Sequence, residues 1–155
     1  MKPLFDESNW AALEAIAQRW VGTPFAPGGA VCGPRGGASC GRMVVAILSE
    51  SGLPITQQEF PDTPLNRATH YPGSVMSDLL RALPERFFES TAKDIQPGDI
   101  LIIKLGIGAH HAGIALPGQR VIHSWQKEGA HINRWDEPRL TKRIYSVFRP
   151  LITTP

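Results

Sequence analysis

Residues 40–52 read CGRMVVAILSESG, an apolar run that opens on a cysteine and closes on Gly52. Its large apolar side chains recur at helical spacing, and a glycine is a common helix stop. These side chains are Met43, Val44, Ile47 and Leu48. A thiol at the start of a helix gains thiolate character from the positive end of the helix dipole. Cys40 is therefore a candidate nucleophile, and a small hydrophobe buried under a loop is the alternative interpretation.

Two segments precede this helix. Residues 6–21 carry apolar side chains at helical spacing and end before Gly22, so we expect a core-facing amphipathic helix. Residues 22–39 read GTPFAPGGAVCGPRGGAS, and their glycine and proline content predicts a long irregular loop that leads to the nucleophile. Cys32 lies inside this loop with no helix behind it, which disfavours Cys32 as a nucleophile.

Beyond residue 52 the chain contains a loop, a short helix and then a series of strand-like runs. Residues 53–73 carry repeated prolines among polar residues and predict a surface loop long enough to be a lid or a binding flap. A short helix is expected over 74–83. After the turn signal at 96–99 come five strand-like runs, ILIIKL, HHAGIAL, RVIHSWQ, AHINRW and IYSVFR. Helices followed by strands indicate an α+β fold and one domain over 1–155, with the N-terminal helices packed on a five-stranded antiparallel sheet or half-barrel.

Histidines on these runs suit a thiol mechanism. His110 and His111 are neighbours on a strand, so they point to opposite faces and only one of them can face Cys40. The residues alone do not choose between the two. His123, on the next run, is either the residue that orients this base, as in a catalytic triad, or a satisfied core histidine. A cysteine with a histidine base is typical of hydrolases that cut amide bonds. We expect His131 to be an exposed structural residue.

Composition disfavours several other classes of function. The net charge is only +2, which leaves nucleic-acid binding unsupported. No apolar run approaches the length of a membrane span. The first residues, MKPLFDESNW, lack the apolar core of a secretory signal, so we expect cytoplasmic synthesis and, for any role outside, delivery by lysis, a particle or a secretion machine. Cysteines in such a chain are expected to be free thiols.

A zinc site is the competing chemistry, because the chain offers several thiol and imidazole ligands. They are Cys32, Cys40, His110, His111 and His123. No pair of them shows the short C-x-x-C or H-E-x-x-H spacing that supports a zinc site. We therefore expect no metal, and a thiol mechanism requires no organic cofactor.

Three segments resemble motifs of the NlpC/P60 cysteine peptidases, a papain-like family that cleaves peptidoglycan stem peptides. The helix of the nucleophile usually opens with Asp-Cys-Ser-Gly in that family, and residues 39–53 lie over it. The strand of the base usually reads His-x-Gly-Ile, which residues 111–114 match. An Ile-His-Ser segment follows at 122–124, as in the family. The order and spacing of these motifs agree over roughly residues 10–150.

The resemblance implies a papain-like fold and a role for each reactive residue. Cys40 is the implied nucleophile, His111 the implied general base and His123 the implied orienting residue. The closing VFRP at 147–150 resembles a subgroup found in phage and prophage tail genes. That subgroup implies phage tail proteins as partners and delivery to the cell wall with the virion.

Three departures from the family pattern fall at expected substrate-binding positions. Ser39 stands where an aspartate usually helps to hold the amino group of the substrate. Arg42 follows Gly41 where Ser-Gly is usual, and it either reads a substrate carboxylate or obstructs the cleft. Phe25 keeps the ring of a common tyrosine without its hydroxyl. The departures leave three hypotheses open: a hydrolase, a weakly active or inactive tail-assembly or wall-binding module, and an enzyme that transfers an acyl group or cuts another amide.

Overall fold

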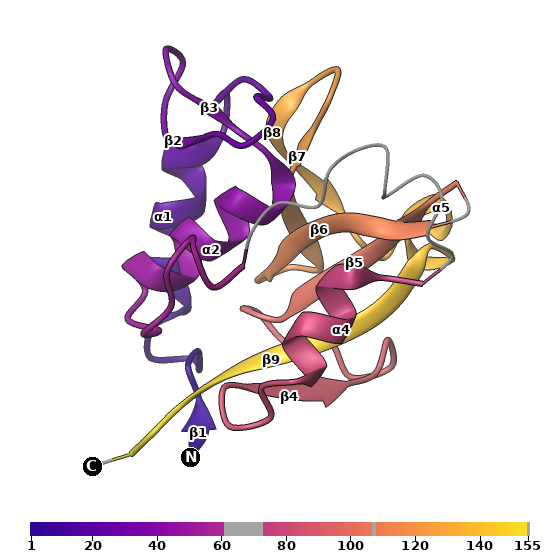
Figure 1. Ribbon diagram of the computed structural model, residues 1–155. Helices are drawn as coiled ribbons and strands as arrows, with labels where there is room; N and C mark the ends of the chain where they lie inside the picture. The colour runs from indigo at the N-terminus through magenta and orange to yellow at the C-terminus, as the bar shows by residue number, and fades with distance from the viewer. Residues whose placement is uncertain (61–72, 107, 155) are drawn as a thin grey trace.

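The computed structural model describes residues 1–60, 73–106 and 108–154 (Figure 1). Its helices in these ranges are α1 (Trp10–Trp20), α2 (Cys40–Glu50), α4 (Val75–Arg81) and α5 (Pro138–Thr141). Its strands are β1 (Lys2–Pro3), β2 (Ala30–Val31), β3 (Gly37–Ala38), β4 (Phe87–Ser90), β5 (Ile100–Leu105), β6 (Gly108–Leu116), β7 (Arg120–Trp125), β8 (Gly129–Arg134) and β9 (Ile144–Ile152). Helices therefore dominate the first half and strands the second, which confirms the α+β class.

Helix α2 confirms the element expected over 40–52. Ser39 is its N-cap, and the Ser39 hydroxyl accepts a hydrogen bond from the backbone N–H of Arg42 at 3.4 Å. The helix ends at Glu50, and Gly52 then adopts φ +103°, which glycine reaches without strain. The expected apolar face is buried and also includes Val45. Helix α1 forms within the predicted range 6–21 and buries Leu13, Ala17 and Trp20.

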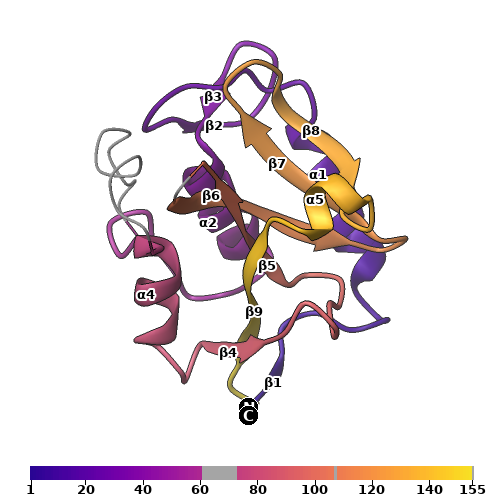
Figure 2. The same cartoon turned by 90° about the vertical axis from the view of Figure 1, so that its right-hand side faces the viewer.

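The five predicted strand-like runs all form strands, β5 to β9. They belong to an antiparallel sheet in the order β1-β9-β5-β6-β7-β8, in which β4 also pairs with β9. Among the described residues this sheet has seven strands, since β1 and β4 were not predicted. Both are too short to show an alternating pattern. Strand β5 has register irregularities against β6 and β9, which increase local twist, and the sheet curls into a half-barrel (Figure 2).

Alternation along β5 gives the sheet two buried faces. Ile100 and Ile102 belong to the large core that includes residues of α1 and α2. Leu101 and Ile103 belong to a smaller core against which Leu140 of α5 packs. Figure 2 shows α2 behind the sheet and α5 in front of it. Because β5 is covered on both sides, its sequence ILIIKL is nearly continuous in apolar residues and does not alternate.

The glycine-rich segment 22–39 is not wholly irregular, contrary to our expectation. Strands β2 and β3 pair there as a small antiparallel hairpin, with Ala30 opposite Ala38. Gly36 is needed within this hairpin because a Cβ at that position would overlap the carbonyl oxygen of Val31. Two-residue strands leave no periodic pattern, so composition alone did not reveal the hairpin.

The loop predicted over 53–73 is described only in part. Residues 61–72, which hold most of the predicted lid, lie outside the described residues. The helix predicted over 74–83 is confirmed as α4, and the backbone N–H of Ser77 donates to the hydroxyl of its N-cap Ser74 at 3.0 Å. Within the described ranges, no helix is long and apolar enough to cross a membrane.

Candidate active site

Cys40 is the first residue of α2 and is partly buried. The first N–H groups of a helix are not used inside that helix, so the positive end of the α2 dipole lies at Cys40. This placement suits a thiol that ionises. Cys32, in contrast, is exposed on the loop before the helix, and its thiol lies 3.1 Å from the carbonyl oxygen of Arg19. The two cysteines, both within the described ranges, form no disulfide.

His111 on β6 and His123 on β7 are buried side by side, with exposed fractions of 4% and 6%. Gly113 is the direct cross-strand partner of His123, so His111 is its diagonal neighbour. The Nε2 atom of His111 lies 2.7 Å from Nδ1 of His123. Burial lowers the pKa of His123, although the hydrogen bond that His123 makes to the amide oxygen of Asn133 acts in the opposite direction. Tertiary structure thus brings the predicted base and the predicted orienting residue into hydrogen-bond contact.

Three further side chains surround this pair, and sequence reasoning did not select any of them. The Nε2 atom of His123 lies 2.7 Å from Oδ1 of Asn133. His131 is the cross-strand partner of His123, and their ring centroids are 4.4 Å apart. The ring of Trp125 meets His111 edge-on at 5.4 Å. His131 is half-buried, so the expectation of an exposed residue was wrong. The β7–β8 register, which puts 123, 131 and 133 on one face, brings His131 and Asn133 to His123, and the sequence by itself did not give this register.

The segment before Cys40 is bonded to the strands that carry the histidines. The hydroxyl of Ser124, the residue after His123, donates to the carbonyl oxygen of Ala38 at 2.8 Å. Helix α2 also packs against β6 and β7. Parts of the chain that are far apart in sequence therefore converge around the start of α2.

The three residues predicted on the substrate-binding side have different surroundings. Phe25 is half-buried and forms a β-bridge with Ala38. Ser39 is buried as the cap of α2. Arg42 turns toward Gln57: its Nη1 donates to the carbonyl oxygen of Gln57 at 3.1 Å. The side-chain amide of Gln57 in turn donates to the carbonyl oxygen of Arg42 at 2.9 Å. This reciprocal pair holds the start of α2 to the segment after the helix.

A pocket of ≈ 280 Å³ lies on the α5 side of the sheet, and both imidazoles line it. Its wall also contains Trp125, His131 and Asn133, together with the cationic side chains of Arg134, Arg139 and Arg143 and the carboxylates of Glu128 and Glu137. A pocket of this size and mixed polarity can receive a short polar segment of a ligand.

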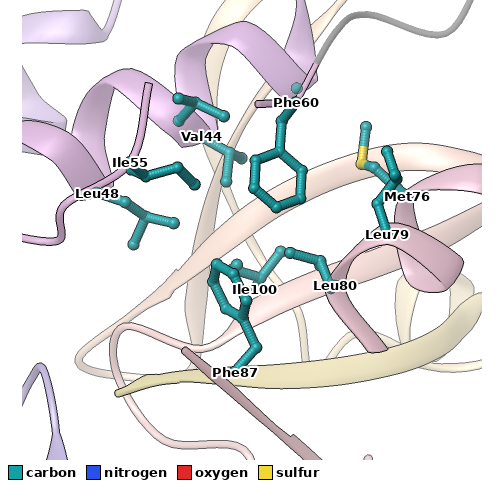
Figure 3. A pocket seen from close by; sticks show the side chains of 11 residues that line it. Val44, Leu48, Ile55, Phe60, Met76, Leu79, Leu80, Phe87 and Ile100 are labelled. Atoms are coloured by element: carbon teal, nitrogen blue, oxygen red, sulfur yellow. The ribbon is translucent and has the colours of Figure 1, made fainter. Parts of the chain in front are cut away.

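A second cavity lies between α2 and α4 and is apolar (Figure 3). The rings of Phe60 and Phe87 meet in it at an interplanar angle of 82°, and Val44, Leu79 and Leu80 surround them. Its volume of ≈ 30 Å³ holds only a water-sized molecule, and apolar cavities usually stay dry. We therefore interpret it as imperfect core packing and not as a substrate site.

The described residues contain no group of three or more His, Cys, Asp or Glu side chains placed to hold a metal ion. No protein-family model and no curated protein sequence matches the chain.

Solved structures do match it. A Staphylococcus aureus protein of the NLP/P60 family, described as similar to lipoprotein, aligns with TM-score 0.63 and 16% identity over 96% of this chain. The chain spans only 43% of that protein's length. The NlpC/p60 domain of the peptidoglycan hydrolase SagA aligns with TM-score 0.52 and 22% identity, over 93% of this chain and 99% of that domain. The Mycobacterium tuberculosis peptidoglycan hydrolase RipB aligns with TM-score 0.56 and 14% identity, over 97% and 70% of the two chains.

Proposed function

We propose that this chain, which has the NlpC/P60 fold, is a cysteine hydrolase that cleaves an amide bond in peptidoglycan stem peptides. The observation that carries the proposal is the 2.7 Å contact between Nε2 of His111 and Nδ1 of His123. A base held through one ring nitrogen keeps its other nitrogen, Nδ1, aimed at a reaction partner. Cys40, at a helix start, has the placement of the activated nucleophile that such a base serves.

In the proposed reaction the Cys40 sulfur, as thiolate, bonds to the carbonyl carbon of the scissile amide. The backbone N–H of Cys40, at the positive end of α2, stabilises the oxyanion that forms. The imidazolium of His111 then protonates the amide nitrogen, and the C–N bond breaks to leave a thioester. A water molecule that gives a proton to His111 attacks this thioester, which releases the acid and regenerates the thiolate.

The sheet constrains how Cys40 and His111 meet in this mechanism. His111 and His123 line the pocket on the α5 side, whereas α2 packs its apolar face on the other side. We therefore infer that the thiol reaches the imidazole around the beginning of β6, where α2 starts, and not through the sheet. The arginines of the 280 Å³ pocket suit the carboxylates that peptidoglycan stem peptides carry.

Turnover of purified muropeptides, followed by mass spectrometry, tests this proposal. We expect Cys40→Ala and His111→Ala to abolish cleavage, because each removes a reacting group. Cys32→Ala and His110→Ala are the matched controls and should retain it. Iodoacetamide should label Cys40 faster than Cys32. Cleavage by Cys40→Ala at the wild-type rate would refute the hydrolase, and products longer than the substrate would indicate acyl transfer.

The second candidate function is a wall-binding or tail-assembly module on the same fold with weak or no activity. The contact between Arg42 and Gln57 favours it, because a large cation is fixed in the first turn of the nucleophile helix. This candidate predicts muropeptide binding that survives Cys40→Ala, with no cleavage by the wild-type protein. The association with phage tail proteins stays a prediction from the sequence, and virion incorporation is its test.

A further inference from the structure

The contact between the two buried histidines continues to a third side chain. His111 Nε2 lies 2.7 Å from His123 Nδ1, and His123 Nε2 lies 2.7 Å from Oδ1 of Asn133. From this geometry we propose that Asn133 is a positioning residue, whose amide oxygen ends a hydrogen-bond chain and thereby decides which nitrogen of His111 carries the proton. The proposal rests on the proposed function for its catalytic consequence, but the proton positions exist without any substrate.

The direction of the hydrogen bonds in this series follows from which atoms can donate a proton and which can only accept one. An amide oxygen only accepts hydrogen bonds, so the proton on His123 must sit on Nε2. A neutral imidazole has one N–H, and burial lowers the pKa of His123, which favours this neutral form. Nδ1 of His123 must then accept, and Nε2 of His111 must donate. A neutral His111 in this arrangement carries no proton on Nδ1, which is the nitrogen that a general base needs.

The same hydrogen-bond direction also suits the step of the reaction in which His111 is positively charged. When His111 becomes an imidazolium, its Nε2–H still needs an acceptor, and Nδ1 of His123 remains one. With the opposite direction, in which His123 carries its proton on Nδ1, two N–H groups would face each other across 2.7 Å. A water molecule in place of Asn133 would not select a direction, because water donates and accepts equally well.

Titratable groups from each neighbouring element bear on His123. His111 faces it from β6. The ring of His131, tilted by 43° against it, lowers the pKa of His123 from β8, and Glu128 in the turn between β7 and β8 raises it. A carboxylate at position 133 would raise the pKa of His123 as well. A doubly protonated His123 donates from both nitrogens and no longer accepts from His111.

Nitrogen-15 NMR of the histidine rings tests the proposal directly. The wild-type protein without substrate should show a protonated Nε2 for both His111 and His123 and an unprotonated Nδ1 for His123. Asn133→Leu should change the ring shifts of both residues and lower muropeptide kcat/KM by about 10–100-fold. Asn133→Asp keeps an oxygen acceptor at this position, so His123 should still carry its proton on Nε2. Because the carboxylate raises the pKa of His123, the acidic limb of the pH–rate profile should move to higher pH.

Gln18→Leu is the matched control, because it also replaces an amide by leucine and removes only an exposed hydrogen bond to Glu14. It should leave the histidine spectra and the turnover unchanged. A wild-type spectrum with the His123 proton on Nδ1, or an unchanged spectrum in Asn133→Leu, would overturn the proposal. Cys40→Ala could stay active while the NMR spectra show the proton positions proposed for His111 and His123. In that case the proposed function fails and the proposed role of Asn133 stands.

Discussion

Ser124 and Ala38, which are 86 positions apart in the sequence, share a buried hydrogen bond of 2.8 Å between the serine hydroxyl and the alanine carbonyl oxygen. Ala38 lies two residues before Cys40, and Ser124 lies one residue after His123. The bond therefore couples the loop that delivers the predicted nucleophile to the strand that carries the predicted orienting residue.

Ser124→Ala should destabilise the protein by about 0.5–1.5 kcal/mol, because it removes one of the two hydrogen bonds to the Ala38 carbonyl oxygen, which still accepts from the backbone N–H of Ala26 at 3.3 Å. Urea unfolding gives the free energy. Ser90→Ala is the control, since the Ser90 hydroxyl bonds to the Asp94 carbonyl oxygen in an exposed setting, and its effect should stay within about 0.5 kcal/mol. Equal losses in the two variants would contradict the importance of the buried bond.

Gly129→Ala should cost at least about 1 kcal/mol more than Gly118→Ala. Both glycines have positive φ, +68° and +81°, so the conformational penalty of a Cβ is similar. A Cβ at Gly129 would also overlap the carbonyl oxygen of Thr23, whereas a Cβ at Gly118 meets only Arg120 Nε at 3.6 Å. Thermal unfolding of the two variants checks the difference, and similar midpoints would argue against the close approach.

Arg149→Leu should lower the unfolding free energy by about 3–5 kcal/mol near neutral pH, because it leaves the buried Asp99 carboxylate without its cationic partner. Burial already raises the pKa of Asp99 above 3.8, although Arg149 acts in the opposite direction. Without Arg149 the folded pKa rises further, so protonation favours the folded state. The deficit relative to wild type should therefore shrink as the pH falls toward 3.8 and grow as the pH rises. A pH-independent deficit would contradict this account.

His123 should make folding weaker in acid. Burial lowers its folded pKa below the ordinary 6.5, so the unfolded chain binds more protons than the folded chain between the two values. The stability contributed by the neutral ring is complete above pH 6.5 and decreases as the pH falls toward the folded pKa. NMR titration of the His123 ring in the folded protein measures that pKa. A midpoint at or above 6.5 would contradict the prediction.

Long periodic segments were predictable from the sequence, and short ones were not. Helix α2 and strands β5 to β9 each carry enough residues to show a repeat, so their existence and type followed from side-chain spacing. Strands β1, β2, β3 and β4 have only two to four residues each and therefore show no readable period. Their pairing depends on partners that lie far away in the chain or on the space that a glycine such as Gly36 leaves.

Local chemistry by itself determined which residue types are candidates for reaction. Side-chain spacing predicted a cysteine at the first position of a helix, and it predicted His111 and His123 on consecutive strands. Alternation also predicts that His110 and His111 face opposite ways, and the side chain of His110 lies outside the described residues. These properties depend on residues next to one another, which is why they were readable from one sequence.

Only the tertiary structure decided which groups touch. The pairing of β7 with β8 brings Asn133 to His123, and the return of the chain after α2 brings Gln57 to Arg42. A shift of one residue in the β7–β8 register would put other side chains next to His123, although the sequence pattern of each strand would stay the same. Hydrogen-bond partners across strands are set by register and by burial, and both arise from the packing of the whole chain.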